Sequence, residues 1–326
     1  MKRFLTVLVL IAVAASTLPA AAAPQMVLRL GETHVADYPT TRGDMEFSRL
    51  VEERTGGRIR IEVYHSKQLG EEKAVIEQVQ FGAIDFTRVS ISPLAAFAPA
   101  FDALQMPYLY RDEEHMWKVL NGPIGEEFLN SLEPANFVGL CWYDSGARNF
   151  YNSRREIKSV ADLKGLKIRV QESKLMMGLV SALGAVPTPM PFGEVYSALQ
   201  TGVIDGAENN WPSYFSTSHY EVAKYFTLDG HTRVPEILIA SKMTMDKLSK
   251  EDQDIIRQAA KDSMPYQIKL WKEYEKVSEE KVTAAGSIIT HLSPEAVSAF
   301  QKAMEPLYSE LKPELQEVVK KIREVQ

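Results

Sequence analysis

The stretch QFGAID, residues 80–85, recurs almost unchanged as QTGVID at residues 200–205. In each copy a glycine follows a run with helical spacing, and an isoleucine and an aspartate, Asp85 or Asp205, come after it. A glycine that ends a helix and a β-branched residue that begins a strand together predict a helix-to-strand corner. One such match could arise by chance, but two that each close the same order of elements predict two similar α/β lobes.

Strand and helix patterns alternate around the first corner. Residues 27–30, 58–63 and 83–89 have the apolar or alternating patterns of strands, and helical spacing occupies 47–51 and 75–79 between them. A β-α-β-α-β order requires crossover connections, so it predicts a largely parallel sheet with helices on its faces.

The same order recurs around the second corner. Residues 167–170 are a predicted strand, Ser173 is placed to cap a helix that runs to Leu183, and a further helix through 195–199 ends at Gly202. The expected fold class is therefore α/β, with two lobes.

The C-terminal third is predicted to be helical. Residues 250–285 are rich in Lys, Glu, Gln and Ala, with apolar residues at helical spacing, which indicates one long helix that can run across both lobes. Pro265 lies inside it, and because a proline removes a backbone donor, we expect the helix to be interrupted and kinked there. Ser293 is placed to cap the helix that follows.

The first residues have the composition of an export signal. Lys2 and Arg3 precede an apolar run from 4 to 18 and a series of alanines, which predicts a secretory signal peptide over residues 1–22, cleaved near Ala22. The apolar run is too short to span a membrane. We therefore expect an exported, periplasmic protein.

Composition argues against several kinds of partner and site. Without Lys2 and Arg3 the chain has 35 basic and 43 acidic residues, a formal net charge of −8, and its basic residues do not cluster, so no nucleic-acid partner is expected. Cys141 is the only cysteine, which leaves no disulfide or cysteine-based metal site, and we interpret it as a buried strand residue. The six histidines lack metal-ligand spacing, and His219 and His231 are interpreted as surface or hydrogen-bonded residues.

Motifs of catalysis are also missing from the sequence. It contains no nucleophile elbow, zinc-protease helix, Walker loop or dinucleotide-binding glycine pattern. Asp205 and Glu208 could form a carboxylate pair, but capping a turn or accepting hydrogen bonds is the favoured role for them. We expect no catalytic residue, no cofactor and no metal.

Three arginines occupy positions where a charge is costly. Arg169 interrupts a strand otherwise suited to burial, Arg148 follows the apolar run that contains Cys141, and Arg88 lies at the end of the strand after the first corner. A buried arginine must be paired or must face a ligand. Because a guanidinium binds carboxylate or phosphate oxygens bidentately, and because open α/β sheets bind ligands at the carboxyl ends of their strands, these arginines predict an anion site.

Segments 146–152, 157–170 and 202–209, which include DLKGLKIRV and GVIDGAEN, resemble the solute-binding proteins of tripartite ATP-independent periplasmic (TRAP) transporters. The resemblance extends over the whole chain after the signal peptide. It implies a two-lobed periplasmic binding protein of type II-like fold, with a hinged cleft, a long kinked helix spanning both lobes, and no catalysis.

The resemblance also implies site residues. Arg169 matches the arginine that binds the ligand carboxylate, Asn209 matches an amide that holds the same group, and Arg148 matches a second ligand-facing arginine. Glu72 is informative, because an acidic group in an anion site is tolerated only where the ligand donates hydrogen bonds, as sugar hydroxyls do. The remaining candidate ligand-binding residues are His34, Arg88, Ser90 and Asn210, directed at ligand hydroxyls, and Trp211 and Tyr214 for aromatic stacking, with core packing as the favoured role of Trp211.

These residues predict a binding protein for a carboxylated small molecule, most specifically a hexuronate such as glucuronate or galacturonate, or a related sugar acid. Cleft closure would capture the ligand, and TRAP permease membrane subunits would receive it from a monomeric binding protein. Alternatives are a four-carbon dicarboxylate or another organic acid as ligand, a ligand-sensing subunit, and a periplasmic enzyme with Glu72 or Asp205 as base.

The expected organisation has two lobes that each combine two segments of chain. Lobe I comprises residues 23–145 and 234–265, and lobe II comprises 146–233 and 266–326. The expected hinges are Asp144–Gly146, Arg233–Pro235 and the kink at Pro265.

Overall fold

A computed structural model of the protein describes residues 24–326. The expected signal peptide, residues 1–22, and its cleavage site near Ala22 lie outside the described residues. Among the helices of residues 24–326, none is long and apolar enough to cross a membrane.

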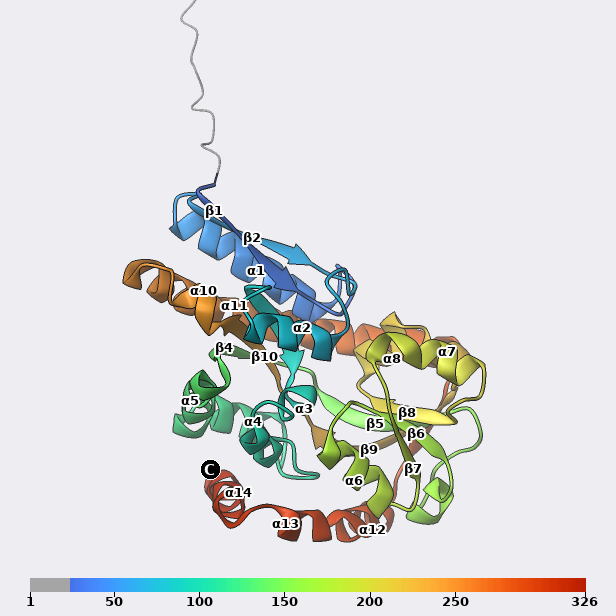
Figure 1. Ribbon diagram of the computed structural model, residues 1–326. Coiled ribbons are helices and arrows are strands. Elements are labelled where there is room, and N and C mark those ends of the chain that lie inside the picture. Colours follow the sequence, from blue (N-terminus) through green and yellow to red (C-terminus); the bar gives the residue numbers. More distant parts are fainter. Residues whose placement is uncertain (1–23) are drawn as a thin grey trace, which may run out of the picture.

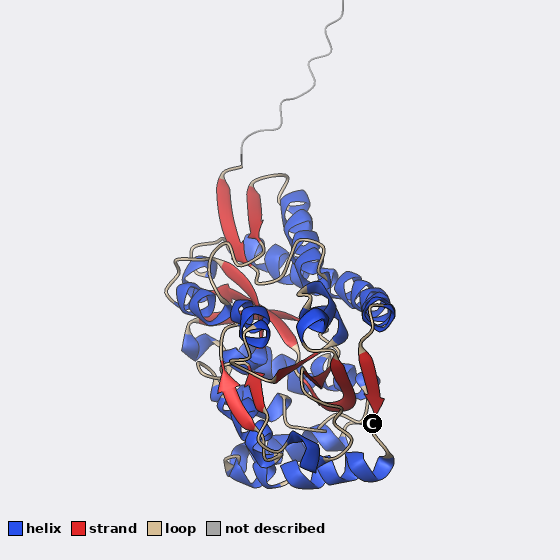
Figure 2. Ribbon diagram, turned by 90° about the vertical axis from the view of Figure 1, so that its right-hand side faces the viewer, coloured by secondary structure: helices blue, strands red, loops and turns tan. Residues whose placement is uncertain are grey.

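Two mixed sheets form the centre of the protein, with helices around them (Figures 1 and 2). The first sheet has the order β2-β1-β3-β10-β4. Its strands are β1 (Met26–Gly31), β2 (Ile59–Tyr64), β3 (Phe86–Ser90), β4 (Phe137–Tyr143) and β10 (Glu236–Ser241). The second has the order β11-β9-β5-β8-β6-β7. Its strands are β5 (Ala147–Asn152), β6 (Lys167–Val170), β7 (Val186–Pro189), β8 (Gly206–Asn209), β9 (Tyr225–Arg233) and β11 (Ile288–His291).

The prediction of a largely parallel sheet is confirmed, with one antiparallel strand in each sheet. In the first sheet β1 is parallel to β2 and β3, but β10 is antiparallel to both β3 and β4. In the second, β5 is antiparallel to both β8 and β9. Strand β10 and strand β5 each follow directly after the chain has crossed from the other sheet, at residues 234–235 and 144–146, and local β-α-β order does not specify such a crossing.

The two repeated corners make equivalent hydrogen bonds. Asp85, just before β3, accepts a hydrogen bond from the Arg29 backbone N–H of β1 at 2.8 Å. Asp205, just before β8, accepts one from the Lys167 backbone N–H of β6 at 2.9 Å. In each lobe the corner aspartate therefore fastens the start of one strand to its parallel neighbour, which explains why the same text recurs.

Helices surround the sheets (Figure 2). The α-helices are α1 (Pro39–Arg54), α2 (Glu72–Gln80), α3 (Ile91–Leu94), α4 (Glu113–Leu120), α5 (Pro123–Asn130), α6 (Lys174–Ala182), α7 (Val195–Gln200), α8 (Trp211–Ser216), α9 (His219–Val222), α10 (Lys242–Met245), α11 (Lys250–Ala284), α12 (Pro294–Met304), α13 (Pro306–Glu310) and α14 (Pro313–Glu324). Short 3₁₀ helices are η1 (Pro99–Leu104), η2 (Glu133–Ala135), η3 (Val160–Leu163) and η4 (Phe192–Glu194). The expected caps are present, because Ser173 accepts from Met176 N and Ser293 from Ala296 N.

Helix α11 connects both halves of the protein (Figure 1). It packs on α1 and β4 beside the first sheet and on α8 beside the second. The predicted long helix is confirmed, and it continues through Pro265 instead of being interrupted there. A helix packed on both sides can lose the one hydrogen bond that a proline removes and still persist.

The last helices lead from the second half of the protein back to the first. Helix α12 contacts α6, η3 and β9, whereas α14 contacts η1 (Figure 1). The C-terminal segment thus begins against elements beside the second sheet and ends against elements that precede β4.

Candidate functional site

A partly enclosed cavity, of about 400 Å³ with the solvent at its mouth included, lies between the two halves. Eight of the ten residues that the sequence indicated line it: His34, Glu72, Arg88, Ser90, Arg148, Arg169, Asn209 and Asn210. Strand ends explain their convergence. His34 follows β1, Ser90 ends β3, Asn209 ends β8, and Arg169 is the penultimate residue of β6. Binding at the carboxyl ends of parallel strands is the general rule for open α/β sheets.

Arg169 is a buried cation without a carboxylate partner among the described residues. It is 3% exposed, and its Nε and Nη2 donate to the Met190 carbonyl at 3.0 and 2.8 Å. The aromatic ring of Phe192 lies 5.9 Å from its guanidinium carbon. Burial lowers the pKa of Arg169, because the charged form has lost water and nearby charges do not fully replace it. An anionic ligand oxygen would supply the missing counter-charge.

Arg148 has an internal counter-ion, which the sequence analysis did not assign to it. Its Nε and Nη2 both reach the Glu208 carboxylate, Nη2 at 2.8 Å, and Nη1 donates to Asn209 Oδ1 at 3.1 Å. Burial alone would raise the pKa of Glu208, but Arg148 and His231 outweigh it and hold that pKa at about 2. Arg148 lines the cavity as half of a neutral ion pair. It also holds the Oδ1 of Asn209, and the Nδ2 of Asn209 donates to no described residue, so it remains available to a ligand.

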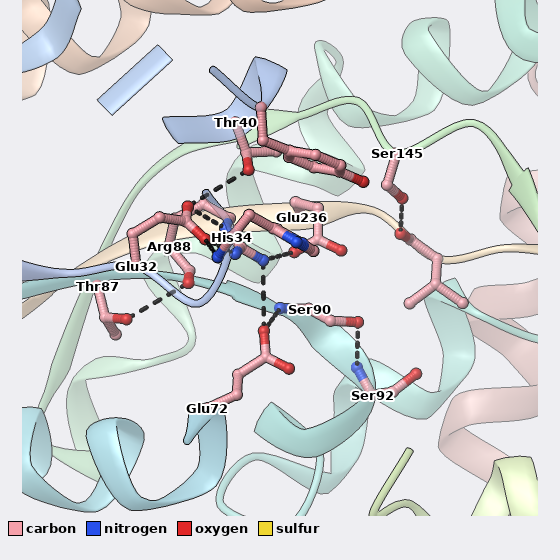
Figure 3. A network of polar contacts seen from close by, with 12 residues as sticks. Glu32, His34, Thr40, Glu72, Thr87, Arg88, Ser90, Ser92, Ser145 and Glu236 are labelled. Carbon is pink, nitrogen blue, oxygen red and sulfur yellow. Dashed lines mark hydrogen bonds and ion pairs between the residues drawn. The ribbon is translucent and has the colours of Figure 1, made fainter. Parts of the chain in front are cut away.

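Arg88 is the centre of an acidic cluster that we define as Glu32, Glu72, Arg88 and Glu236 (Figure 3). Its Nε and Nη2 contact Glu32, and its Nη1 donates to Glu236 at 2.6 Å and to Glu72 at 3.3 Å. The interpretation of Arg88 as a cation for the ligand is therefore corrected. Three carboxylates surround one guanidinium, so this wall of the cavity presents negative charge.

The two glutamates of this cluster that line the cavity each keep one oxygen available. Glu72 Oε1 accepts from the Ser90 backbone N–H at 2.8 Å and from Arg88, and Glu236 uses Oε2 for Arg88. The other oxygen of each makes no hydrogen bond with a described residue. Burial raises the pKa of Glu72 to about 7 and also raises that of Glu236, which Arg88 opposes. Free carboxyl oxygens in such a place suit hydroxyl donors.

Contacts across the cavity join the two halves. Tyr38 of the first half hydrogen-bonds Ser213 Oγ of the second at 2.8 Å, and Lys73 pairs with Glu172 at 3.8 Å. Asn210 caps α8 by accepting from Ser213 N, and its Nδ2 donates to the Ser145 carbonyl at 2.9 Å. Asn210 therefore ties α8 to a segment that crosses between the sheets.

Trp211 and Tyr214 do not line this cavity, so the stacking alternative is corrected, and the core packing favoured for Trp211 is confirmed. Trp211 stacks on Phe226 with ring centroids 3.9 Å apart, and Tyr214 donates to the Ala223 carbonyl at 2.7 Å. Both belong to the apolar core beside the second sheet. They lie on helix α8, whose first turn turns its aromatic residues toward that core.

The other candidate residues lie outside the cavity wall. Asp205 is held by the Lys167 backbone and by Arg154, at 2.7 Å. His231 is buried, and its Nδ1 contacts Asp229 at 2.6 Å. Burial alone would lower its pKa, but Asp229 and Glu208 raise it to about 9. His219 hydrogen-bonds Tyr151, and Cys141 is buried in β4, as the sequence predicted.

The sequence analysis missed half of the cavity wall, namely Thr33, Tyr38, Thr40, Ser145, Gln171, Phe192, Glu236 and Trp271. Glu236 gave a usable signal, because a single acidic residue opens the otherwise apolar run EILIA at 236–240. Trp271 gave none, since its position fits the apolar face of the long helix equally well.

The comparisons with known proteins agree with this geometry. Residues 30–314 match the family model of bacterial extracellular solute-binding proteins, family 7. A curated solute-binding protein of Chromohalobacter salexigens is 38% identical over 90% of this chain and 88% of its own length.

Solved structures are similar throughout. A TRAP periplasmic solute-binding protein of Bradyrhizobium sp. BTAi1, crystallised with α/β-D-galacturonate, is 47% identical, with a TM-score of 0.89 over 91% of this chain and 99% of its own. One from C. salexigens with bound D-glucuronate is 38% identical, with a TM-score of 0.89 over 92% and 100%.

Proposed function

The chain belongs to family 7 of the bacterial extracellular solute-binding proteins, the TRAP solute-binding proteins, and we propose that it captures a hexuronate in the cavity between its lobes. Galacturonate and glucuronate are the two candidates, because the similar proteins described above were crystallised with them. The observation that carries the proposal is the unequal charge of the cavity: an unpaired buried Arg169 at one wall and free acidic oxygens of Glu72 and Glu236 at the other.

Each end of a hexuronate matches one wall. The Arg169 guanidinium binds the carboxylate bidentately, and Asn209 adds a hydrogen bond from its Nδ2. The sugar hydroxyls donate to the free oxygens of Glu72 and Glu236, whose hydrogen bonds to a ligand replace those to water. His34 completes this wall as a neutral ring, since burial and then Arg88 lower its pKa to about 3.

A four-carbon dicarboxylate fits this arrangement less well. Its second carboxylate would face Glu72 and Glu236, where it would meet like charge in a desolvated place. A like-charge contact across an interface costs several kcal/mol. The acidic cluster therefore favours a ligand with one carboxylate over a ligand with two.

Capture proceeds by closure of the two lobes. The ligand makes its full set of contacts only when both lobes meet around it, so binding shifts the equilibrium toward the closed form. We place the lobes at residues 23–145 with 234–265 and 146–233 with 266–326, although α14 packs on η1 of the first. Hinges at Asp144–Gly146 and Arg233–Pro235 coincide with the two crossings between the sheets.

The closed form would deliver its ligand to the membrane subunits of a TRAP permease from the periplasm, after removal of residues 1–22. A ligand-sensing subunit would capture the ligand in the same way but would present it to a receptor instead of a permease. Uptake of the ligand by vesicles that contain the permease distinguishes transport from sensing. Only a transport function predicts uptake that depends on this protein.

A matched set of ligands tests the binding proposal. Galacturonate, galactose and galactarate share a hydroxyl pattern and carry one, no and two carboxylates, and succinate represents the four-carbon dicarboxylates. At a concentration of about 100 Kd a ligand stabilises the folded protein by about 2.7 kcal/mol, which raises Tm by roughly 5 °C for a chain of this size.

We expect this rise with galacturonate or glucuronate, and none with galactose. A larger rise with succinate or galactarate than with either hexuronate would contradict the role given to Glu72 and Glu236.

A further inference from the structure

Asp44 is a buried carboxyl group without a hydrogen-bond donor. It lies in α1, is 0% exposed, and neither of its oxygens finds a donor among the described residues. An ionised carboxylate in this state would carry the full cost of burying an unpaired charge, several kcal/mol. A protonated carboxyl would instead carry a donor of its own.

The charged and titratable groups coupled electrostatically to Asp44 include one cation. They are Glu32 from the end of β1, Arg88 from β3, Glu236 from β10, and Cys141 and Tyr143 from β4. Arg88, the only cation among them, already serves Glu32, Glu72 and Glu236 (Figure 3). A negative charge on Asp44 would be a fourth carboxylate around one guanidinium.

The neighbouring Glu32 has the opposite environment. Its Oε1 accepts from the His34 backbone N–H at 2.7 Å and from Arg88, and its Oε2 accepts from Arg88 at 2.8 Å and from Thr40 at 3.3 Å. Burial alone would raise its pKa, but Arg88 outweighs burial and holds the pKa of Glu32 at about 2. Burial, and then Glu32, raise the pKa of Asp44 well above its usual range. Two neighbouring carboxyls with pKa values pushed apart share one proton, which stays on the less stabilised member.

We propose that Asp44 is a positioning residue, a neutral carboxylic acid whose O–H donates a hydrogen bond to the Glu32 carboxylate and thereby holds Glu32 against Arg88. Neither Asp44 nor Glu32 lines the cavity, whereas Arg88, Glu72 and Glu236 do. A chain of polar contacts thus leads from Asp44 in the core through Glu32 and Arg88 to Glu72 and Glu236, on the wall that receives the ligand hydroxyls. The effect of Asp44 on ligand affinity rests on the proposed hexuronate binding. The protonation of Asp44 does not rest on that proposal.

Asp44→Asn and Asp44→Ala separate the donor from the charge. An asparagine amide donates the same hydrogen bond to Glu32 and does not titrate, whereas alanine donates nothing. Affinity for galacturonate and glucuronate is measured by calorimetry on the mature chain, and Tm is measured without ligand from pH 5 to pH 9.

The sign of the pH effect follows from the raised pKa. A carboxyl whose pKa is higher in the folded than in the unfolded state makes stability fall as pH rises above the unfolded value. We therefore expect the Tm of the wild-type protein to fall more steeply with pH than that of Asp44→Asn. The steeper fall should persist in a Glu72→Gln background, which removes the titration of Glu72 from both proteins.

For binding, we expect Asp44→Asn to keep affinity within threefold of wild type and Asp44→Ala to lose at least tenfold. Equal losses in the two variants would show that the carboxyl itself is needed and would overturn the proposal. Parallel pH profiles of the ligand-free wild type and Asp44→Asn would overturn it as well. If no hexuronate binds the wild type, the proposed function fails, and the ligand-free pH profiles still decide the state of Asp44.

Discussion

Replacing Arg169 by glutamine should abolish tight ligand binding without harming the ligand-free protein. The reason is that Arg169 is buried and has no carboxylate partner among residues 24–326, so its charge is a cost until an anion arrives. Glutamine is neutral and can still donate to the Met190 carbonyl, which Arg169 contacts through Nε and Nη2.

The size of the loss follows from the lost charge pair. Removing one partner of a buried, hydrogen-bonded charge pair costs about 2–5 kcal/mol of binding, which corresponds to roughly 30- to 3,000-fold weaker affinity. The free energy of unfolding of ligand-free Arg169→Gln should stay within about 1 kcal/mol of wild type or rise, because a desolvated charge has been removed.

Arg148→Gln is the matched control, because it removes the same charge from the same cavity. Arg148 is paired with Glu208, which is 0% exposed, so the variant leaves a buried carboxylate largely uncompensated and should lose about 3 kcal/mol or more of stability. Urea unfolding without ligand and calorimetric titration with hexuronates measure the two effects. The reasoning is refuted if ligand-free Arg169→Gln is destabilised as much as Arg148→Gln, or if it still binds hexuronate within threefold of wild type.

Three further variants test other parts of the site. At pH 8, above the raised pKa of Glu72, Glu72→Gln should narrow the preference for galacturonate over galactarate by about tenfold, since about 1.4 kcal/mol of like-charge repulsion disappears. An unchanged affinity ratio in calorimetry with both ligands would contradict this role of Glu72. Gly146→Ala should lower the unfolding free energy in urea by about 1–2 kcal/mol, because Gly146 has φ +61°, where a Cβ crowds the following carbonyl oxygen; wild-type stability would contradict this. His231 has a pKa raised from 6.5 to about 9, so its contribution to stability is complete below pH 6.5 and is lost as pH rises toward 9. His231→Gln should therefore flatten the dependence of Tm on pH in that range. A Tm profile parallel to that of wild type would exclude this contribution of His231.

The fold was largely predictable because its signals are local. Helix caps at Ser173 and Ser293, the period-2 strand at 58–63 and the repeated corners depend on neighbours within a few residues, and the structure contains all of them. The antiparallel strands β10 and β5 were not predictable in this way. Each is defined by a partner that lies far away in sequence, Ser90 opposite Glu236 for example.

The site was predictable in its residues and less so in their roles. Residue type, together with position near a strand end for His34, Arg88 and Ser90 and at the start of helix α2 for Glu72, indicated these four residues of one cavity wall. Core packing was the favoured role of Trp211, and it is confirmed, because the ring stacks on Phe226. For Tyr214 the sequence shows only that an aromatic residue lies close after Asn210, and the direction of α8 shows that its ring belongs to the same core.

Arg88 and Arg169 show why the role of a buried arginine depends on the partners brought by tertiary structure. Both lie near the carboxyl end of a parallel strand and both are almost fully buried. Arg88 meets Glu32, from the end of the neighbouring strand, and Glu236, from the strand that returns out of the other lobe, so its charge is more than neutralised. Arg169 contacts the Met190 carbonyl and the face of Phe192, and it forms no ion pair with a carboxylate among residues 24–326.

This difference orients the ligand. With Arg148 neutralised by Glu208, Arg169 is the one lining cation without a carboxylate among the described residues, and the acidic cluster lies on the other lobe. In the proposed complex, a ligand with one negative charge and several hydroxyls satisfies both walls in a single orientation, with its carboxylate on β6 and its hydroxyls toward β3 and α2. Since the ligand reaches both walls at once only when the lobes meet, the charge asymmetry that favours a sugar acid also couples its binding to closure.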